Sequence, residues 1–191
     1  AASQRLSTSL EARYFLSDDY YASLLLLPFL GRELYRPTLS AGRLVERPDE
    51  IASAISAFLQ RPRLAPSDAY VSGYDFLIDQ ATSISATLRG RGLTVTGRID
   101  NVWTAGDFRA DVLSKTVGPG LLSLNGHFEH SRFFPFALPD VTAADFLLAS
   151  TSFSGTLGYS VGCHSGLNVP DTAELPAERR TDWPQVFAGR N

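Results

Sequence analysis

The stretch that decides the fold is Gly120-Leu121-Leu122-Ser123-Leu124-Asn125, a short and nearly continuous apolar run. Such a run is expected for a strand of a parallel sheet that helices bury on both faces. Further strands are predicted along the same part of the chain, over 69–73, 93–99 and 155–162. They alternate with predicted helices over 75–89, 104–113, 142–149 and 181–188. Thr104 is expected to cap the second of these helices, with Asp107 as the acid of a capping box. This alternation predicts an α/β fold with a mostly parallel central sheet flanked by helices.

The N-terminal part of the chain lacks this regular alternation. Short strands are predicted over 13–16 and 38–45, a helix is predicted over 49–60, and residues 20–30 fit either a helix or a strand. Pro62 and Pro66 then mark a linker. We therefore expect residues 1–66 to be the C-terminal part of a preceding subdomain, and residues 67–191 to be a second subdomain.

Composition restricts the classes of protein. The chain has 191 residues, 44% of them hydrophobic, with 12 Phe and 7 Tyr, which is ample for a core. A net charge of −3 argues against a nucleic-acid-binding domain. The longest uncharged apolar run, Ala22 to Leu30, falls short of the roughly 20 residues of a membrane span. No secretory signal peptide is recognisable, and the single cysteine and three histidines show no zinc-binding spacing.

The absence of methionine, the low fraction of charged residues and the end of the chain directly after a predicted helix lead us to expect a segment of a longer chain. Such a segment would contact the rest of its parent chain or a partner subunit.

The only cysteine and all three histidines follow predicted strands. Ligands of open parallel sheets bind beyond the carboxyl ends of the strands. His127 follows the strand at 120–125, and Cys163 follows the strand at 155–162. A thiol beside an imidazole forms a nucleophile and its base. The competing interpretation is a buried structural cysteine.

The motifs around these residues are Asn125-Gly126-His127 and Val161-Gly162-Cys163-His164-Ser165-Gly166. Together with Ser17-Asp18-Asp19-Tyr20-Tyr21, Ala41-Gly42-Arg43-Leu44 and Pro48-Asp49-Glu50, their order and spacing resemble the caspase-like cysteine peptidases, and the gingipain family in particular. The resemblance runs from about Tyr14 to Ala188. It implies a caspase-like three-layer fold and a bacterial, secreted or cell-envelope cysteine endopeptidase.

The resemblance also implies roles for individual residues. Cys163 would be the nucleophile and His127 the general base, with the backbone N–H groups of Cys163 and Phe128 as oxyanion donors. The family has Gly after the histidine, so the Phe128 side chain is expected to crowd the cleft. Asp79, with Asp75 and Glu129, would contact a peptide or protein substrate and favour cleavage after Arg or Lys.

Each of these roles has a simpler alternative. Asp75 and Asp79 are also the acids that a helix N-terminus favours, and Glu129 can be a solvated loop residue. No cofactor is required, and Asp18 and Asp19 could contribute to a structural calcium site, although two acids do not specify one.

Two other functions remain open at this point. A catalytically inactive caspase-like domain could act as a binding or scaffold module, which the replacement of Gly by Phe128 favours. A doubly wound nucleotide- or flavin-binding domain ranks behind it, because neither Gly73 nor Gly118-Pro119-Gly120 forms a phosphate loop.

Overall fold

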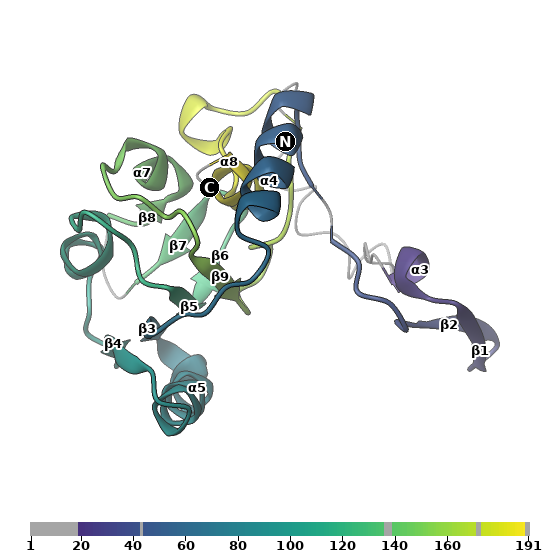
Figure 1. Ribbon diagram of the computed structural model, residues 1–191, viewed down its shortest axis with the longest axis horizontal. Helices are drawn as coiled ribbons and strands as arrows, with labels where there is room; N and C mark the ends of the chain where they lie inside the picture. Colours follow the sequence, from purple (N-terminus) through teal and green to yellow (C-terminus); the bar gives the residue numbers. More distant parts are fainter. Residues whose placement is uncertain (1–18, 43, 136–138, 171–172, 190–191) are drawn as a thin grey trace. The chain divides into compact units, whose positions relative to one another are not determined.

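The computed structural model describes residues 19–42, 44–135, 139–170 and 173–189 and divides into two compact units, residues 1–43 and 44–191 (Figure 1). The helix expected over 49–60 is α4 (Pro48–Gln60), and it packs within the larger unit. The assignment of residues 1–66 to a preceding subdomain of a parent fold stays a prediction.

The smaller unit contains a helical turn and a hairpin. The segment that fitted either a helix or a strand contains both, namely α3 (Asp19–Ala22) and β1 (Leu25–Phe29). β1 pairs with β2 (Arg32–Arg36) in antiparallel register, with Leu25 opposite Arg36. The strand proposed over 13–16 lies outside the described residues.

The strand predicted over 38–45 is wrong. The described residues of this stretch form no strand. Instead, the backbone N–H groups of Thr38 and Leu39 both donate to the Ala22 carbonyl, at 2.9 and 3.0 Å. Two successive donors on one acceptor close a loop, whereas a β-ladder spreads its hydrogen bonds over alternate residues.

The central sheet of the larger unit has four parallel strands in the order β4-β3-β5-β9. They are β3 (Asp68–Gly73), β4 (Thr94–Ile99), β5 (Leu121–Asn125) and β9 (Leu157–Ser160). β5 lies within the apolar run at 120–125, and its residues 122–125 are buried. The prediction of an α/β fold with a parallel central sheet is confirmed.

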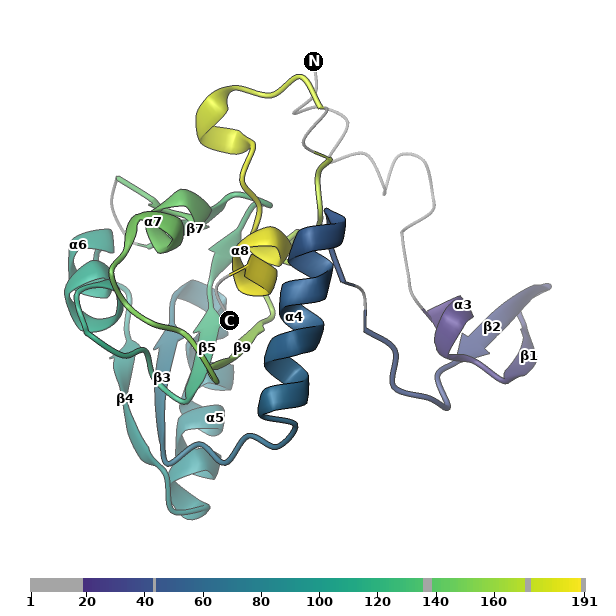
Figure 2. The same cartoon turned by 45° about the horizontal axis from the view of Figure 1, so that its top comes forward.

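Helices cover both faces of this sheet (Figures 1 and 2). α5 (Ile78–Gly90), preceded by the short turn η1 (Asp75–Leu77), packs on one face against β3 and β4. The opposite face carries α6 (Ala105–Phe108), η2 (Arg109–Leu113), α7 (Ala143–Leu148) and α8 (Trp183–Gly189). α4 lies against α8. The short turn η3 (Ala177–Arg179) precedes α8 in the chain. The result is a three-layer α/β arrangement.

An aromatic core fills the layer between the sheet and α6, α7 and α8. Its fully buried rings include Trp103, Phe108, Phe133, Phe146 and Trp183. The Phe108 and Phe133 ring centroids are 5.8 Å apart, and those of Phe146 and Trp183 are 5.5 Å apart, both edge to face. This geometry is favourable for aromatic pairs.

A second, antiparallel sheet follows β5 directly and was not predicted. It consists of β6 (His127–Phe128), β7 (Arg132–Phe134) and β8 (Val141–Thr142). His127 pairs with Phe134, and Phe128 pairs with Phe133. The predicted catalytic histidine therefore lies in a short strand that is paired with β7, and not in an open loop.

Candidate functional site

The candidate site lies beyond the carboxyl ends of three neighbouring strands. Asp75 follows β3, His127 follows β5, and Cys163 follows β9. β5 pairs with both β3 and β9, and all three run parallel. The three segments therefore leave the same edge of the sheet, as the sequence predicted for His127 and Cys163.

His127 is paired with Asp75. The Nε2 atom of His127 lies 2.9 Å from Oδ2 of Asp75. Asp75 has a positive φ of 56°, which Asp tolerates better than most residues. Its backbone N–H donates to Oδ1 of Asn101 at 2.8 Å, which helps to hold this conformation. The sequence predicted Asp75 as a substrate contact, whereas its carboxylate faces the imidazole.

Two aromatic rings flank the imidazole. The ring centroid of His127 is 6.0 Å from that of Tyr74 and 5.3 Å from that of Phe76, both in edge-to-face geometry. The Tyr74 N–H donates to the Asn125 carbonyl at 3.1 Å, which ties the segment after β3 to the end of β5. The His127 side chain is still 41% exposed. It is therefore held in position and open to a reactant.

Cys163 lies in a tight turn after β9. The turn is closed by Ser165, whose N–H and Oγ both donate to the Gly162 carbonyl, at 3.3 and 2.8 Å. The Gly162 N–H donates to Oγ of Ser160 at 3.1 Å, and His164 has a φ of 58°. Cys163 is exposed, so the alternative of a buried structural cysteine is wrong.

Phe128 connects the histidine segment to the cysteine turn. The ring of Phe128 lies so close to Gly162 that a Cβ at position 162 would overlap it, and would lie 2.7 Å from the Cβ of Phe128. The residue after His127 thus contacts the residue before Cys163. Only glycine leaves room for this approach.

The expectation that Phe128 crowds the cleft is wrong. Its side chain is 5% exposed and lies in the core, stacked on Phe133 with centroids 4.4 Å apart and edge-on to Trp183 at 5.5 Å. The backbone N–H of Phe128, the predicted oxyanion donor, points in a direction set by the pairing of β6 with β7. Glu129 and Arg132 exchange hydrogen bonds, so the alternation of an antiparallel ladder turns the Phe128 N–H away from β7.

Asp79 and Glu129 were the other predicted substrate contacts. Asp79 is exposed in the first turn of α5. Glu129 is paired through Oε2 with Nη2 of Arg132 at 2.8 Å and with Nη2 of Arg179 at 2.7 Å. Partial burial raises the pKa of Glu129, but the hydrogen bond and the charges of the two arginines outweigh it, so the pKa lies below its ordinary value. The Glu129 carboxylate thus ties the β6–β7 hairpin to the segment of Arg179.

The remaining histidines have different surroundings. His130 is 1% exposed, with Nε2 2.9 Å from the carbonyl oxygen of Arg179, which makes it part of the core. His164 is exposed beside Cys163. Its left-handed backbone conformation belongs to the turn.

The calcium suggestion falls partly outside the described residues, because only Asp19 of its two acids is described. Across the described ranges, no group of three or more His, Cys, Asp and Glu side chains is arranged to hold a metal ion. Within the same ranges, no helix has the length and apolar character needed to cross a bilayer.

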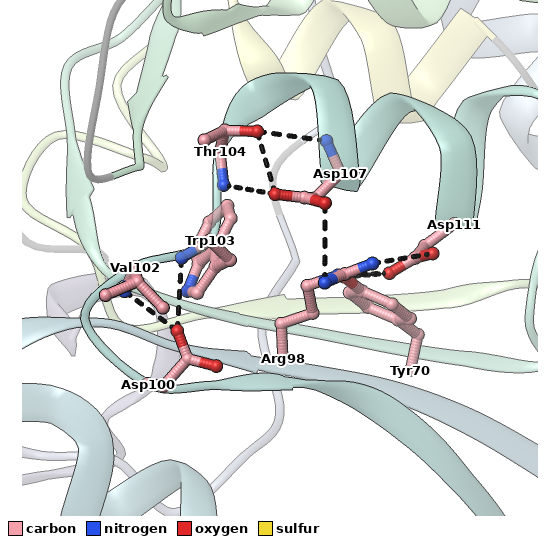
Figure 3. Close-up of polar contacts among 8 residues, drawn as sticks. All are labelled: Tyr70, Arg98, Asp100, Val102, Trp103, Thr104, Asp107 and Asp111. Atoms are coloured by element: carbon pink, nitrogen blue, oxygen red, sulfur yellow. Dashed lines mark hydrogen bonds and ion pairs between the residues drawn. The ribbon is translucent and has the colours of Figure 1, made fainter.

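Figure 3 shows a polar cluster that the sequence did not predict, although Thr104 and Asp107 were predicted to cap a helix. Both oxygens of Asp111 lie near Arg98, at 2.7 and 3.4 Å, and Asp107 lies 3.4 Å from the same guanidinium. Burial and the charge of Asp111 raise the pKa of Tyr70. The cluster fastens β4 to α6 and η2.

Comparisons with protein-family models, with curated proteins and with solved structures found no match for this chain.

Proposed function

We propose that the chain is the catalytic part of a cysteine endopeptidase of gingipain type, which hydrolyses peptide bonds through Cys163 and His127. The observation that carries the proposal is the 2.9 Å pair between His127, which follows β5, and Asp75, which follows β3. An exposed cysteine follows β9, the other neighbour of β5. An acid that fixes one imidazole nitrogen leaves the other as a base, which is the logic of a nucleophile, base and orienting acid.

In this mechanism Asp75 accepts the hydrogen bond from Nε2–H of His127, so Nδ1 is the basic nitrogen. Nδ1 takes the proton of the Cys163 thiol, and the thiolate attacks the carbonyl carbon of the substrate. The resulting tetrahedral oxyanion is bound by the N–H groups of Cys163 and Phe128. Losing one such donor typically costs about 2.7–4 kcal/mol of transition-state stabilisation.

The tetrahedral intermediate collapses when the imidazolium of His127 gives its proton to the leaving amine, and a thioester forms on Cys163. His127 then takes a proton from water, and the hydroxide attacks the thioester carbonyl. The acid product leaves, and the thiol regains its proton from His127. Protons and bonds balance over the cycle, and the chemistry needs no cofactor.

Substrate selection is proposed to favour Arg or Lys at the cleavage position. The support is the exposed carboxylate of Asp79, one helical turn after Asp75 at the same edge of the sheet. A carboxylate there can form charge-assisted hydrogen bonds with a basic side chain. The substrate is a peptide or protein, and the resemblance implies that the enzyme itself is secreted or belongs to the cell envelope.

Covalent labelling tests this function. An Arg- or Lys-directed peptidyl chloromethyl ketone should alkylate Cys163, and Cys163→Ala should abolish the labelling measured by intact-protein mass spectrometry. Asp79→Ala should reduce the preference for basic over neutral reagents.

His164→Ala is the matched control for His127→Ala, because His164 is also exposed and is adjacent to Cys163. The control should keep full labelling. Native protein that no substrate-like reagent labels faster than a small alkylating agent would contradict the peptidase, and would favour the inactive binding module.

A further inference from the structure

An aromatic groove borders the Cys163 turn on the side of α8. We call it the α8 groove. It has a volume of about 420 Å³, within the range of roughly 300–1,000 Å³ that ligand pockets occupy. Its walls and mouth include Phe128, Phe153, Trp183, Phe187, Ser165 and Gly166.

The groove borders the cysteine half of the proposed site. Phe128 follows His127 in the chain and also lies against Gly162. Ser165 belongs to the turn that contains Cys163, and Gly166 follows it. A group bound at this end of the α8 groove would therefore lie beside the Cys163 turn.

The lining is uncharged. Tyr159 at the rim carries the only ionisable side chain among the described residues that line the groove. A charged group buried there would lose its hydration without gaining a partner, which is costly. An apolar side chain would instead replace water at the walls, and burying one gains about 1.5–3 kcal/mol. The groove thus suits a neutral apolar group.

The unpaired edge of β9 indicates that the bound molecule is an extended peptide. Among the described strands, β9 pairs only with β5. Leu157 and Tyr159 of β9 are 50% and 51% exposed, and Gly158 between them lines the groove. An extended peptide can add to such an edge, with alternate side chains turned to the same face.

We propose that the α8 groove is a substrate subsite that binds an uncharged apolar side chain, such as Phe or Leu, of an extended peptide lying along β9. The bound residue is a neighbour of the residue at the cleavage position. This inference rests on the proposed peptidase function. It adds a preference for an apolar neighbouring residue to the preference for Arg or Lys at the cleavage position.

Peptide binding to Cys163→Ala tests the subsite, because this variant of the full chain cannot cleave its ligand. The probes are the blocked peptides acetyl-Ala-Phe-Arg-Ala-amide and acetyl-Ala-Asp-Arg-Ala-amide, followed by ¹⁵N NMR titration. The Phe peptide should shift the signals of Gly158, Gly166 and the Trp183 indole saturably. The Asp peptide should bind at least about tenfold more weakly.

A pair of glycine variants supplies the control. A Cβ at Gly166 or at Gly90 meets no atom within 4 Å, so both positions accept a side chain, but only Gly166 lines the groove. Gly166→Leu in the Cys163→Ala background should weaken binding of the Phe peptide by about tenfold. Gly90→Leu, at the far end of α5, should leave it unchanged.

Equal binding of the two peptides, or shifts confined to other parts of the chain, would overturn the subsite. Shifts of the same signals with protein concentration alone would place a second copy in the groove, and would overturn it too. The two proposals fail separately. Binding as expected with no cleavage by native protein contradicts only the peptidase, and cleavage without the binding preference contradicts only the subsite.

Discussion

The segment that carries His127 and the turn that carries Cys163 are held in different ways. His127 pairs with Asp75, contacts two aromatic rings and precedes a residue whose ring is stacked in the core. Cys163 is exposed on a turn closed largely by its own neighbours, with Gly162 set against Phe128.

The base and the thiol are therefore positioned by different kinds of contact. The base is preorganised by a pair and by the core, whereas the thiol depends on a local turn that packs against the base segment through Phe128 and Gly162. A change at that contact should therefore affect both halves, and a change at Asp75 should affect the base alone.

Gly162→Ala should have the largest effect, because it should change both the stability of the fold and the reactivity of Cys163. The added methyl group overlaps the buried Phe128 ring, so either the turn or the core must move. Overpacking of this kind typically costs about 1–3 kcal/mol, measured as the loss of unfolding free energy in urea. Alkylation of Cys163 should also slow.

Gly166→Ala is the control for this change, because its Cβ enters open space. It should alter the unfolding free energy by less than about 0.5 kcal/mol. A Gly162→Ala protein with native stability and native reactivity would show that the two segments do not depend on one another.

Asp75→Asn should have the next largest effect, on reactivity and not on folding. Asn tolerates the positive φ at this position, so the backbone is kept. The amide no longer favours Nε2–H on His127, and the rate of Cys163 alkylation should fall by about tenfold, or roughly 1.4 kcal/mol.

Asp79→Asn serves as the comparison, since Asp79 is exposed on the next turn. With a small reagent that has no basic group, its rate should match that of the native chain. If both variants behave alike, Asp75 does not act through His127.

Glu129→Gln should have the smallest effect, confined to stability and dependent on pH. The pKa of Glu129 lies below its ordinary value, so its pairing with Arg132 and Arg179 stabilises the fold above that ordinary value. The contribution is lost as the pH falls through the folded-state pKa. Urea unfolding should therefore distinguish variant and native chain near neutral pH and not in strong acid.

Much of the fold could be predicted because local sequence patterns, such as apolar runs and helix caps, determine its strands and helices. The apolar run at 121–125 predicted a buried strand, and the capping box of Thr104 and Asp107 predicted the start of α6. A second box, between Asp182 and Gln185, starts α8. Its Asp-x-x-Gln spacing could have been recognised in the same way.

Other features depend on contacts between distant residues. β6 and β8 have two residues each, too few to show an alternating pattern. The pairing of Asp75 with His127 depends on the register of β3 against β5, and the burial of Phe128 depends on Gly162. The sequence indicated the histidine and the cysteine, but no local pattern in it pairs Asp75 with the imidazole.

The proposed chemistry requires His127 to activate the thiol of Cys163. Its most direct test is the rate at which chloroacetamide, a small reagent that needs no substrate recognition, alkylates Cys163 at neutral pH. His127→Ala should slow this rate by at least about tenfold, since the thiolate is the reactive species, while His164→Ala leaves it unchanged. A His127→Ala protein that reacts as fast as the native chain would show that His127 does not activate the thiol.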